Sequence, residues 1–226
     1  MIITIDGPIA TGKSSIAKRL AELLGFIYFD TGAMYRCLTY GIMQHNIDVN
    51  QPVKLKEFLD TFSFDVTIHH GVKKYIVFDE DVTEKIRGES VTNLVSEISA
   101  ISLVRTKLVA LQRDLSQGIN AVFEGRDMGT VVFPNADLKI FLTGRSEVRA
   151  RRRFEELRHR FPGETQTLTI EKALEDINKR DLYDSTREHS PLQKADDAYP
   201  VDTSDLSIDE IVNKILEYVD NLSTQE

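Results

Sequence analysis

One segment near the start of the chain constrains its fold more than any other feature: Gly7-Pro8-Ile9-Ala10-Thr11-Gly12-Lys13-Ser14. These residues fit the pattern G-x-x-x-x-G-K-[ST] at every defined position. The apolar residues 2–5 precede the segment, and apolar residues at helical spacing follow over residues 14–24, with Gly25 as a helix stop. A short apolar run of this kind is typical of a strand buried on both faces of a parallel sheet. The segment therefore predicts a strand, a loop and a helix in an α/β fold.

The pattern is typical of a phosphate-binding loop, or P-loop. A nucleoside triphosphate carries several negative charges, so the loop must approach it closely with backbone N–H groups. Gly7 and Gly12 allow that approach, and the following helix adds the positive end of its dipole. We expect Lys13 to reach the outer phosphates of ATP and the Ser14 hydroxyl to bind Mg²⁺. The residues expected to bind ATP are Gly7, Pro8, Ile9, Ala10, Thr11, Gly12, Lys13, Ser14 and Ser15.

The rest of the chain alternates strand-like and helical segments. Strand-like runs occupy residues 26–29, 121–123, 138–142 and 199–201. Helical spacing occupies residues 33–45, 94–101, 104–115, 147–158 and 170–183, and a capping box, Ser207-x-x-Glu210, starts a last helix. This alternation predicts a single three-layer P-loop domain over residues 1–226, with a central five-stranded parallel sheet.

The middle of the chain departs from that alternation. Residues 64–68 and 75–78 are strand-like on either side of His69-His70-Gly71, which predicts an inserted antiparallel hairpin. A polar break over residues 161–169 separates two of the predicted helices.

Composition excludes several classes of function. With 36 acidic against 28 basic residues, the formal charge of −8 argues against broad binding to nucleic acid or to an anionic membrane. Cys37 is the single cysteine, so the chain cannot form an internal disulfide or a cysteine zinc cluster, and we interpret it as a small helix residue. We find no signal peptide and no apolar stretch long enough to span a membrane, and expect a cytoplasmic protein.

Arginines distinguish among P-loop proteins. Arg36 and Arg126 follow predicted strands, at the sheet edge where α/β proteins bind ligands. Arg180, Asp184 and Arg187 would share one face of a continued helix. Such a set suits a kinase that acts on a small phosphorylated acceptor. A GTPase is disfavoured because the string at residues 178–181, which has the letters of a guanine-reading motif, lies inside a predicted helix.

Structural interpretations of the same residues stay open at this point. The loop could be a glycine-containing turn that binds nothing. Arg180, Asp184 and Arg187 could form a surface ion-pair ladder, and Arg126 could pair with Asp127 in a turn. The arginines at 151–153 could be a solvated face that pairs with the glutamates at 155 and 156. A nucleotide-dependent switch without turnover and a purely structural α/β domain are the corresponding functional alternatives.

Four segments resemble bacterial cytidylate kinases: I-T-I-D-G-P-x-A-x-G-K-S at residues 3–14, D-T-G-A-M-Y-R at 30–36, E-G-R-D-M-G-T-V-V-F-P-N-A at 124–136, and R-D-x-x-D-S-x-R at 180–187. The resemblance implies the nucleoside monophosphate kinase fold and phosphoryl transfer from Mg·ATP to CMP or dCMP. It also implies an acceptor-binding region at residues 37–105, with a β insertion at about 64–82, and a mobile lid at residues 147–190. A kinase of the same fold that acts on UMP, dTMP or shikimate is the nearest rival.

The resemblance also implies roles for individual residues. Lys13, Arg126, Arg153 and Arg180 are the expected catalytic residues, and Ser14 and Glu124 the expected Mg²⁺ ligands, although some members carry Asp in place of Glu124. The expected substrate-binding residues are Thr31, Tyr35, Arg36, Ser96, Arg105, Arg126, Asp127, Arg180, Asp184 and Arg187. Arg105 would donate to cytosine, and Asp127 would accept from its amine, which uracil lacks. We expect ATP, CMP and dCMP as small-molecule partners, no nucleic-acid or membrane partner, and a monomer.

Overall fold

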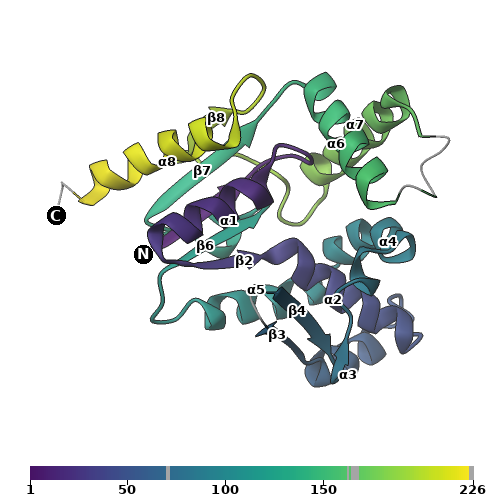
Figure 1. Ribbon diagram of the computed structural model, residues 1–226. Coiled ribbons are helices and arrows are strands. Elements are labelled where there is room, and N and C mark those ends of the chain that lie inside the picture. The colour runs from purple at the N-terminus through teal and green to yellow at the C-terminus, as the bar shows by residue number, and fades with distance from the viewer. Residues whose placement is uncertain (70–71, 162, 164–167, 224–226) are drawn as a thin grey trace. The chain divides into compact units, whose positions relative to one another are not determined.

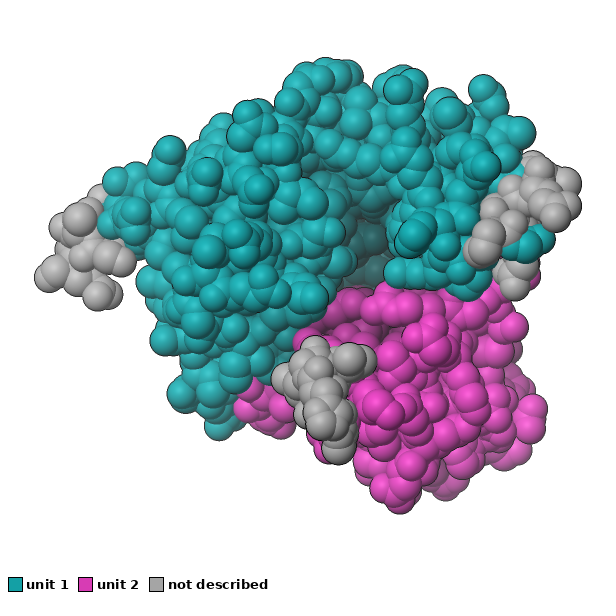
Figure 2. Space-filling model, viewed as in Figure 1, with its two compact units in different colours: residues 1–29, 116–226 teal, residues 30–115 magenta. Residues whose placement is uncertain are grey.

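A computed structural model of the chain describes residues 1–69, 72–161, 163 and 168–223. The chain forms two compact units, which Figure 2 shows in different colours. Unit 1 comprises residues 1–29 and 116–226, and unit 2 comprises residues 30–115. Each unit has a hydrophobic core of its own.

A parallel sheet forms the centre of unit 1 (Figure 1). Its strands are β1 (Ile2–Asp6), β2 (Ile27–Asp30), β6 (Ala121–Gly125), β7 (Leu138–Thr143) and β8 (Tyr199–Asp202). The five strands lie in the order β2-β6-β1-β7-β8. The first strand, β1, pairs in parallel with β6 on one side and β7 on the other, which aligns Ile3 with Val122 and Leu138. The predicted five-stranded parallel sheet is confirmed.

Helices surround this sheet. They are α1 (Lys13–Leu24), α6 (Ser146–Arg160), α7 (Ile170–Thr186) and α8 (Ile208–Ser223), with a short helical turn η2 (Met128–Val132). Helices α1 and α8 pack against each other, and α6 packs along α7, as Figure 1 shows. The capping box is confirmed because the Ser207 N–H donates to Glu210 Oε2 at 2.8 Å and the Glu210 N–H donates back to Ser207 Oγ at 3.3 Å.

Unit 2 contains the predicted antiparallel insertion. Its helices are α2 (Thr31–Gln44), α3 (Pro52–Thr61), η1 (Lys85–Arg87), α4 (Glu89–Ala100) and α5 (Ser102–Leu115), and its strands are β3 (Phe64–His69), β4 (Val72–Val77) and β5 (Glu80–Asp81). The hairpin between β3 and β4 is confirmed, but β4 begins earlier than predicted, and α3 and β5 were not predicted.

Two of the predicted connections fall partly outside the described residues. These are the hairpin turn, at residues 70 and 71, and the polar break, at residues 162 and 164–167. In the part of the chain that the structure describes, no helix is both long and apolar enough to cross a membrane.

Candidate active site

The site of unit 1 lies where three neighbouring strands end. The loop from Gly7 to Gly12 follows β1, Arg126 follows β6, and Gly144 follows β7. Because these strands are parallel neighbours, their carboxyl ends bring the segments together at one edge of the sheet, the usual ligand-binding edge of α/β proteins.

Glycine is required at the first position of the loop. Gly7 has φ +149°, and a Cβ there would lie 2.4 Å from the backbone oxygen of Leu142 on β7. Ala10 and Gly12 also have left-handed backbones, with φ 60° and 88°. Gly12 caps α1 without a side-chain hydrogen bond, so the first N–H groups of α1 lack a capping side chain at the loop. This arrangement suits a bound anion.

Lys13 is buried beneath the loop. Its Nζ donates to the Pro8 carbonyl at 2.6 Å. Burial, and to a smaller extent the charge of Arg126, lower the pKa of Lys13 to about 7, although Glu124, Asp6 and Asp184 oppose the change. The ammonium therefore lies within electrostatic reach of all four groups, and a bound phosphate would favour its charged form.

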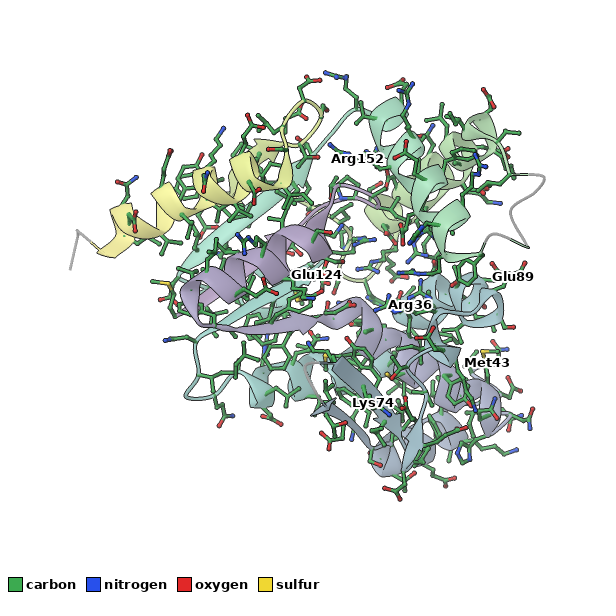
Figure 3. The ribbon with its side chains drawn as sticks, viewed as in Figure 1. Arg36, Met43, Lys74, Glu89, Glu124 and Arg152 are labelled. Carbon is green, nitrogen blue, oxygen red and sulfur yellow. The ribbon has the colours of Figure 1, made fainter. Side chains whose placement is uncertain are left out.

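Glu124 supplies a buried carboxylate at the end of β6 (Figure 3). The Tyr28 hydroxyl donates to its Oε1 at 2.6 Å, which fixes the orientation of the carboxylate. Ser14 lies exposed on the first turn of α1. Mg²⁺ in kinases takes one or two protein oxygens and completes its shell with phosphates and waters. A serine hydroxyl and a carboxylate fit that donor set, so both predicted metal ligands are chemically suitable.

Three predicted arginines gather around two buried carboxylates. Arg126 Nε donates to Asp184 Oδ2 at 2.9 Å, and Arg180 Nε lies 3.3 Å from Asp184 Oδ1. Arg187 Nη2 lies 3.8 Å from Asp127 Oδ1. Burial alone would raise the pKa of Asp184, but Arg126, Arg180 and Arg187 outweigh it and hold the pKa below its ordinary value. The ladder proposed as a surface alternative is thus a largely buried cluster.

Asp6 fixes the turn that carries Arg126 and Asp127. Its carboxylate accepts hydrogen bonds from the N–H groups of Met128, at 2.9 Å, and Gly129, at 2.8 Å. Burial and the nearby Asp127 raise the pKa of Asp6 to about 6, although the two backbone donors and Lys13 oppose the rise. Asp6 was not predicted as a site residue.

The arginine side chains of α6 make different contacts. Arg152 donates to the Thr203 carbonyl at 2.6 Å, and Arg151 is exposed. Arg153 donates to Glu156 of its own helix at 2.9 Å, as the solvated-face interpretation expected, and its catalytic role stays a prediction. Arg149 instead reaches the phosphate-binding loop, and no sequence argument had selected it.

The remaining predicted substrate residues belong to unit 2. Arg36 Nη1 donates to the Ile86 carbonyl at 3.1 Å and to Thr92 Oγ1 at 2.9 Å. The Arg105 guanidinium lies 5.6 Å from the centroid of the Tyr35 ring. Ser96 lies on α4, where its carbonyl accepts the Ser99 hydroxyl, and Thr31 is buried at the start of α2. Within unit 2, therefore, the structure brings Arg105 to Tyr35.

Comparisons with known proteins agree with these features. The cytidylate kinase family model matches residues 3–221. A cytidylate kinase of Protochlamydia amoebophila is 63% identical over 225 residues, which are 100% of this chain and 99% of that protein. One from Bacillus subtilis is 44% identical over 98% of this chain and 97% of its own length. A solved structure of an uncharacterized protein from Eubacterium ventriosum, at 16% identity, covers 98% of each chain with a TM-score of 0.51, a likeness of fold alone.

Proposed function

The chain belongs to the cytidylate kinase family, and on that premise we propose that it transfers the γ-phosphoryl group of ATP to CMP or dCMP. The products are ADP and CDP or dCDP. The observation that carries this proposal is the position of Lys13 beneath the phosphate-binding loop and within electrostatic reach of Arg126. A triphosphate in the loop would therefore meet two cations where its outer phosphates lie.

Catalysis requires alignment and neutralisation of charge more than proton transfer. The phosphate oxygen of the acceptor is already nucleophilic, so no general base is needed. Arg126 and Arg180 bind Asp184, and both arginine side chains are partly exposed. A phosphate can exchange one of these contacts for its own, and the transferring group then lies among cations throughout the reaction. Closure of the segment at residues 147–187 would exclude water and suppress hydrolysis of ATP.

Mg²⁺ is part of the proposal, with the Ser14 hydroxyl and Glu124 as its protein ligands. When bound, it would neutralise charge on the phosphates. Tyr28 would keep the Glu124 carboxylate in one orientation. The expectations of a monomer that acts in the cytoplasm stay predictions, as do the roles of the unit 2 residues.

Asp127 is the proposed reader of the cytosine amine. The side chain is buried and pairs with Arg187, so it presents a charged acceptor in a place that excludes water. Uracil carries a carbonyl in place of the amine, which would leave the carboxylate opposite another acceptor. Mismatches of this kind cost several powers of ten in kcat/KM.

A panel of acceptors tests this function. ADP release in magnesium buffer should depend on CMP or dCMP, and UMP and dTMP should be poor substrates. Replacement of Asp127 by Ala should narrow the CMP to UMP ratio of kcat/KM by about tenfold or more. An unchanged ratio would reject Asp127 as the base reader, and ADP release without any acceptor dependence would favour a nucleotide switch instead.

A further inference from the structure

The backbone of Ile9, in the middle of the phosphate-binding loop, is bound by two side chains of α6 and α7. The Ile9 N–H donates to Asp181 Oδ1 at 3.3 Å, and the Ile9 carbonyl accepts from Arg149 Nη1 at 3.1 Å. Arg149 Nη1 also donates to Asp181 Oδ2 at 2.6 Å. The three residues thus form a closed ring of hydrogen bonds.

Arg149 is itself anchored to the sheet. Its Nε donates at 2.9 Å to the carbonyl of Gly144, which follows β7, and its side chain is only 8% exposed. A guanidinium buried to this degree needs partners for its donors, and here a carboxylate and two carbonyls supply them. The Arg149 side chain is therefore held in place at the carboxyl end of β7, and Asp181 binds α7 to it.

We propose that Arg149 and Asp181 form a clamp that holds the phosphate-binding loop in its binding shape and releases it when α7 moves away. Both are positioning residues that act through the backbone of Ile9. The inference rests on the proposed function only in that the loop binds the phosphates of ATP.

The phosphate-binding loop contains strained backbone, which needs contacts such as the clamp to hold it. Ala10, the next residue, has φ 60°, and Gly7 and Gly12 also have positive φ. A non-glycine residue in this region costs about 1 kcal/mol or more and persists only where its surroundings hold it. The bonds to the N–H and the carbonyl of Ile9 constrain the two peptide units on either side of Ile9, and the second of these adjoins Ala10.

The place of Asp181 on α7 links the loop to the arginine cluster. The adjacent Arg180 contacts Asp184, one turn further along α7, and Asp184 also binds Arg126. A movement of α7 away from the sheet would therefore break the clamp and the cluster together. The loop would then lose its binding shape at the same time as the arginines leave their cluster. The phosphate-binding loop would therefore be held in its binding shape only while the arginine cluster is in place.

Asp181→Asn and Arg149→Lys test the clamp. Asp181→Asn keeps the size and one acceptor oxygen but loses the charge that neutralises Arg149. Arg149→Lys keeps the charge but has a single donor nitrogen, so it cannot replace both the Nε that reaches Gly144 and the Nη1 that reaches Ile9 and Asp181. The matched control is Glu175→Gln, the same acid-to-amide change on an exposed position of α7. Circular dichroism and thermal unfolding establish which variants are folded, and either clamp variant alone suffices for the test.

Two measurements on the nucleotide-free and ADP-bound chain decide the outcome without reference to turnover. Each clamp variant should show hydrogen exchange of the amides at residues 9–13 faster by on the order of tenfold, and a Kd for ADP weaker by on the order of tenfold, the effect of one lost charge-assisted hydrogen bond. Exchange and ADP affinity equal to those of Glu175→Gln would overturn the clamp. Because neither measurement needs an acceptor, failure of the clamp and failure of the proposed function are distinguishable.

Discussion

The lowered pKa of Lys13 predicts that nucleotide binding takes up a proton. Burial lowers this pKa from 10.5 to about 7, and Arg126 acts in the same direction. A phosphate beside the ammonium favours its charged form and returns the pKa toward its ordinary range. A lysine with a pKa of about 7 is about one-tenth protonated near pH 8, and the bound lysine is almost fully protonated. The expected uptake is therefore small near pH 6 and rises to most of a proton near pH 8.

Calorimetry measures this uptake directly. A non-hydrolysable ATP analogue is titrated into the chain, without an acceptor, in two buffers that differ in enthalpy of ionisation. The difference between the observed enthalpies gives the number of protons bound. Lys13→Arg is the control because a guanidinium stays charged at every accessible pH and has no proton to take up. An uptake near zero in the natural chain at about pH 8, or the same uptake in Lys13→Arg, would refute the assignment of a largely neutral Lys13.

Three further predictions concern groups whose surroundings the structure defines. Gly7→Ala places a Cβ 2.4 Å from the Leu142 oxygen and should lower the free energy of unfolding by about 3 kcal/mol in urea titrations. The control is Gly118→Ala, where φ is +71° but no atom lies within 4 Å of the added Cβ, and it should lower the free energy of unfolding by only about 1 kcal/mol. Equal losses would contradict this account of the loop. Burial raises the pKa of the Cys37 thiol to about 12, and Asp30 adds to the rise. Iodoacetamide near pH 8 should therefore label Cys37 in urea but not in the folded chain. Asp6→Asn keeps one acceptor for two N–H donors and should lower kcat/KM for CMP about tenfold or more, with a smaller effect on ADP affinity. Equal losses for both ligands would argue for a general structural role.

Much of the fold could be predicted because its signals are local. The P-loop, the buried strands and the last capping box each depend on a few neighbouring residues. Helix α3 was missed because a single turn of apolar spacing, Leu55, Phe58 and Leu59, is its main signal. Strand β5 has two residues and depends on its pairing with β4.

The site residues also fall into those that local motifs predict and those that depend on the tertiary structure. Lys13, Arg126, Arg180 and Asp184 were found from motifs, and the structure places them in one unit, where Lys13 and Arg180 each lie within electrostatic reach of Arg126 and Asp184. The clamp was not found, because Asp181 lies 172 residues from Ile9 in the chain and their contact exists only once α7 has folded against the sheet.

Arg149 and Arg153 illustrate why the sequence cannot show which arginine of α6 reaches the phosphate-binding loop. Both lie in the arginine-rich helix, and the sequence offers no local reason to choose between them. Their positions, one helical turn apart, direct Arg149 to the loop and Arg153 to Glu156. The choice depends on how α6 leaves β7, which no residue pattern within the helix encodes.

The fate of the γ-phosphoryl group tests the central claim most directly. ATP labelled at the γ-phosphate is incubated with CMP, magnesium and the chain, and the nucleotides are separated. The label should appear in the β-phosphate of CDP in equal amount to the ADP formed, and Lys13→Met should reduce this transfer by orders of magnitude while the fold stays intact. Label that appears only as inorganic phosphate, or transfer that Lys13→Met leaves near normal, would contradict the account.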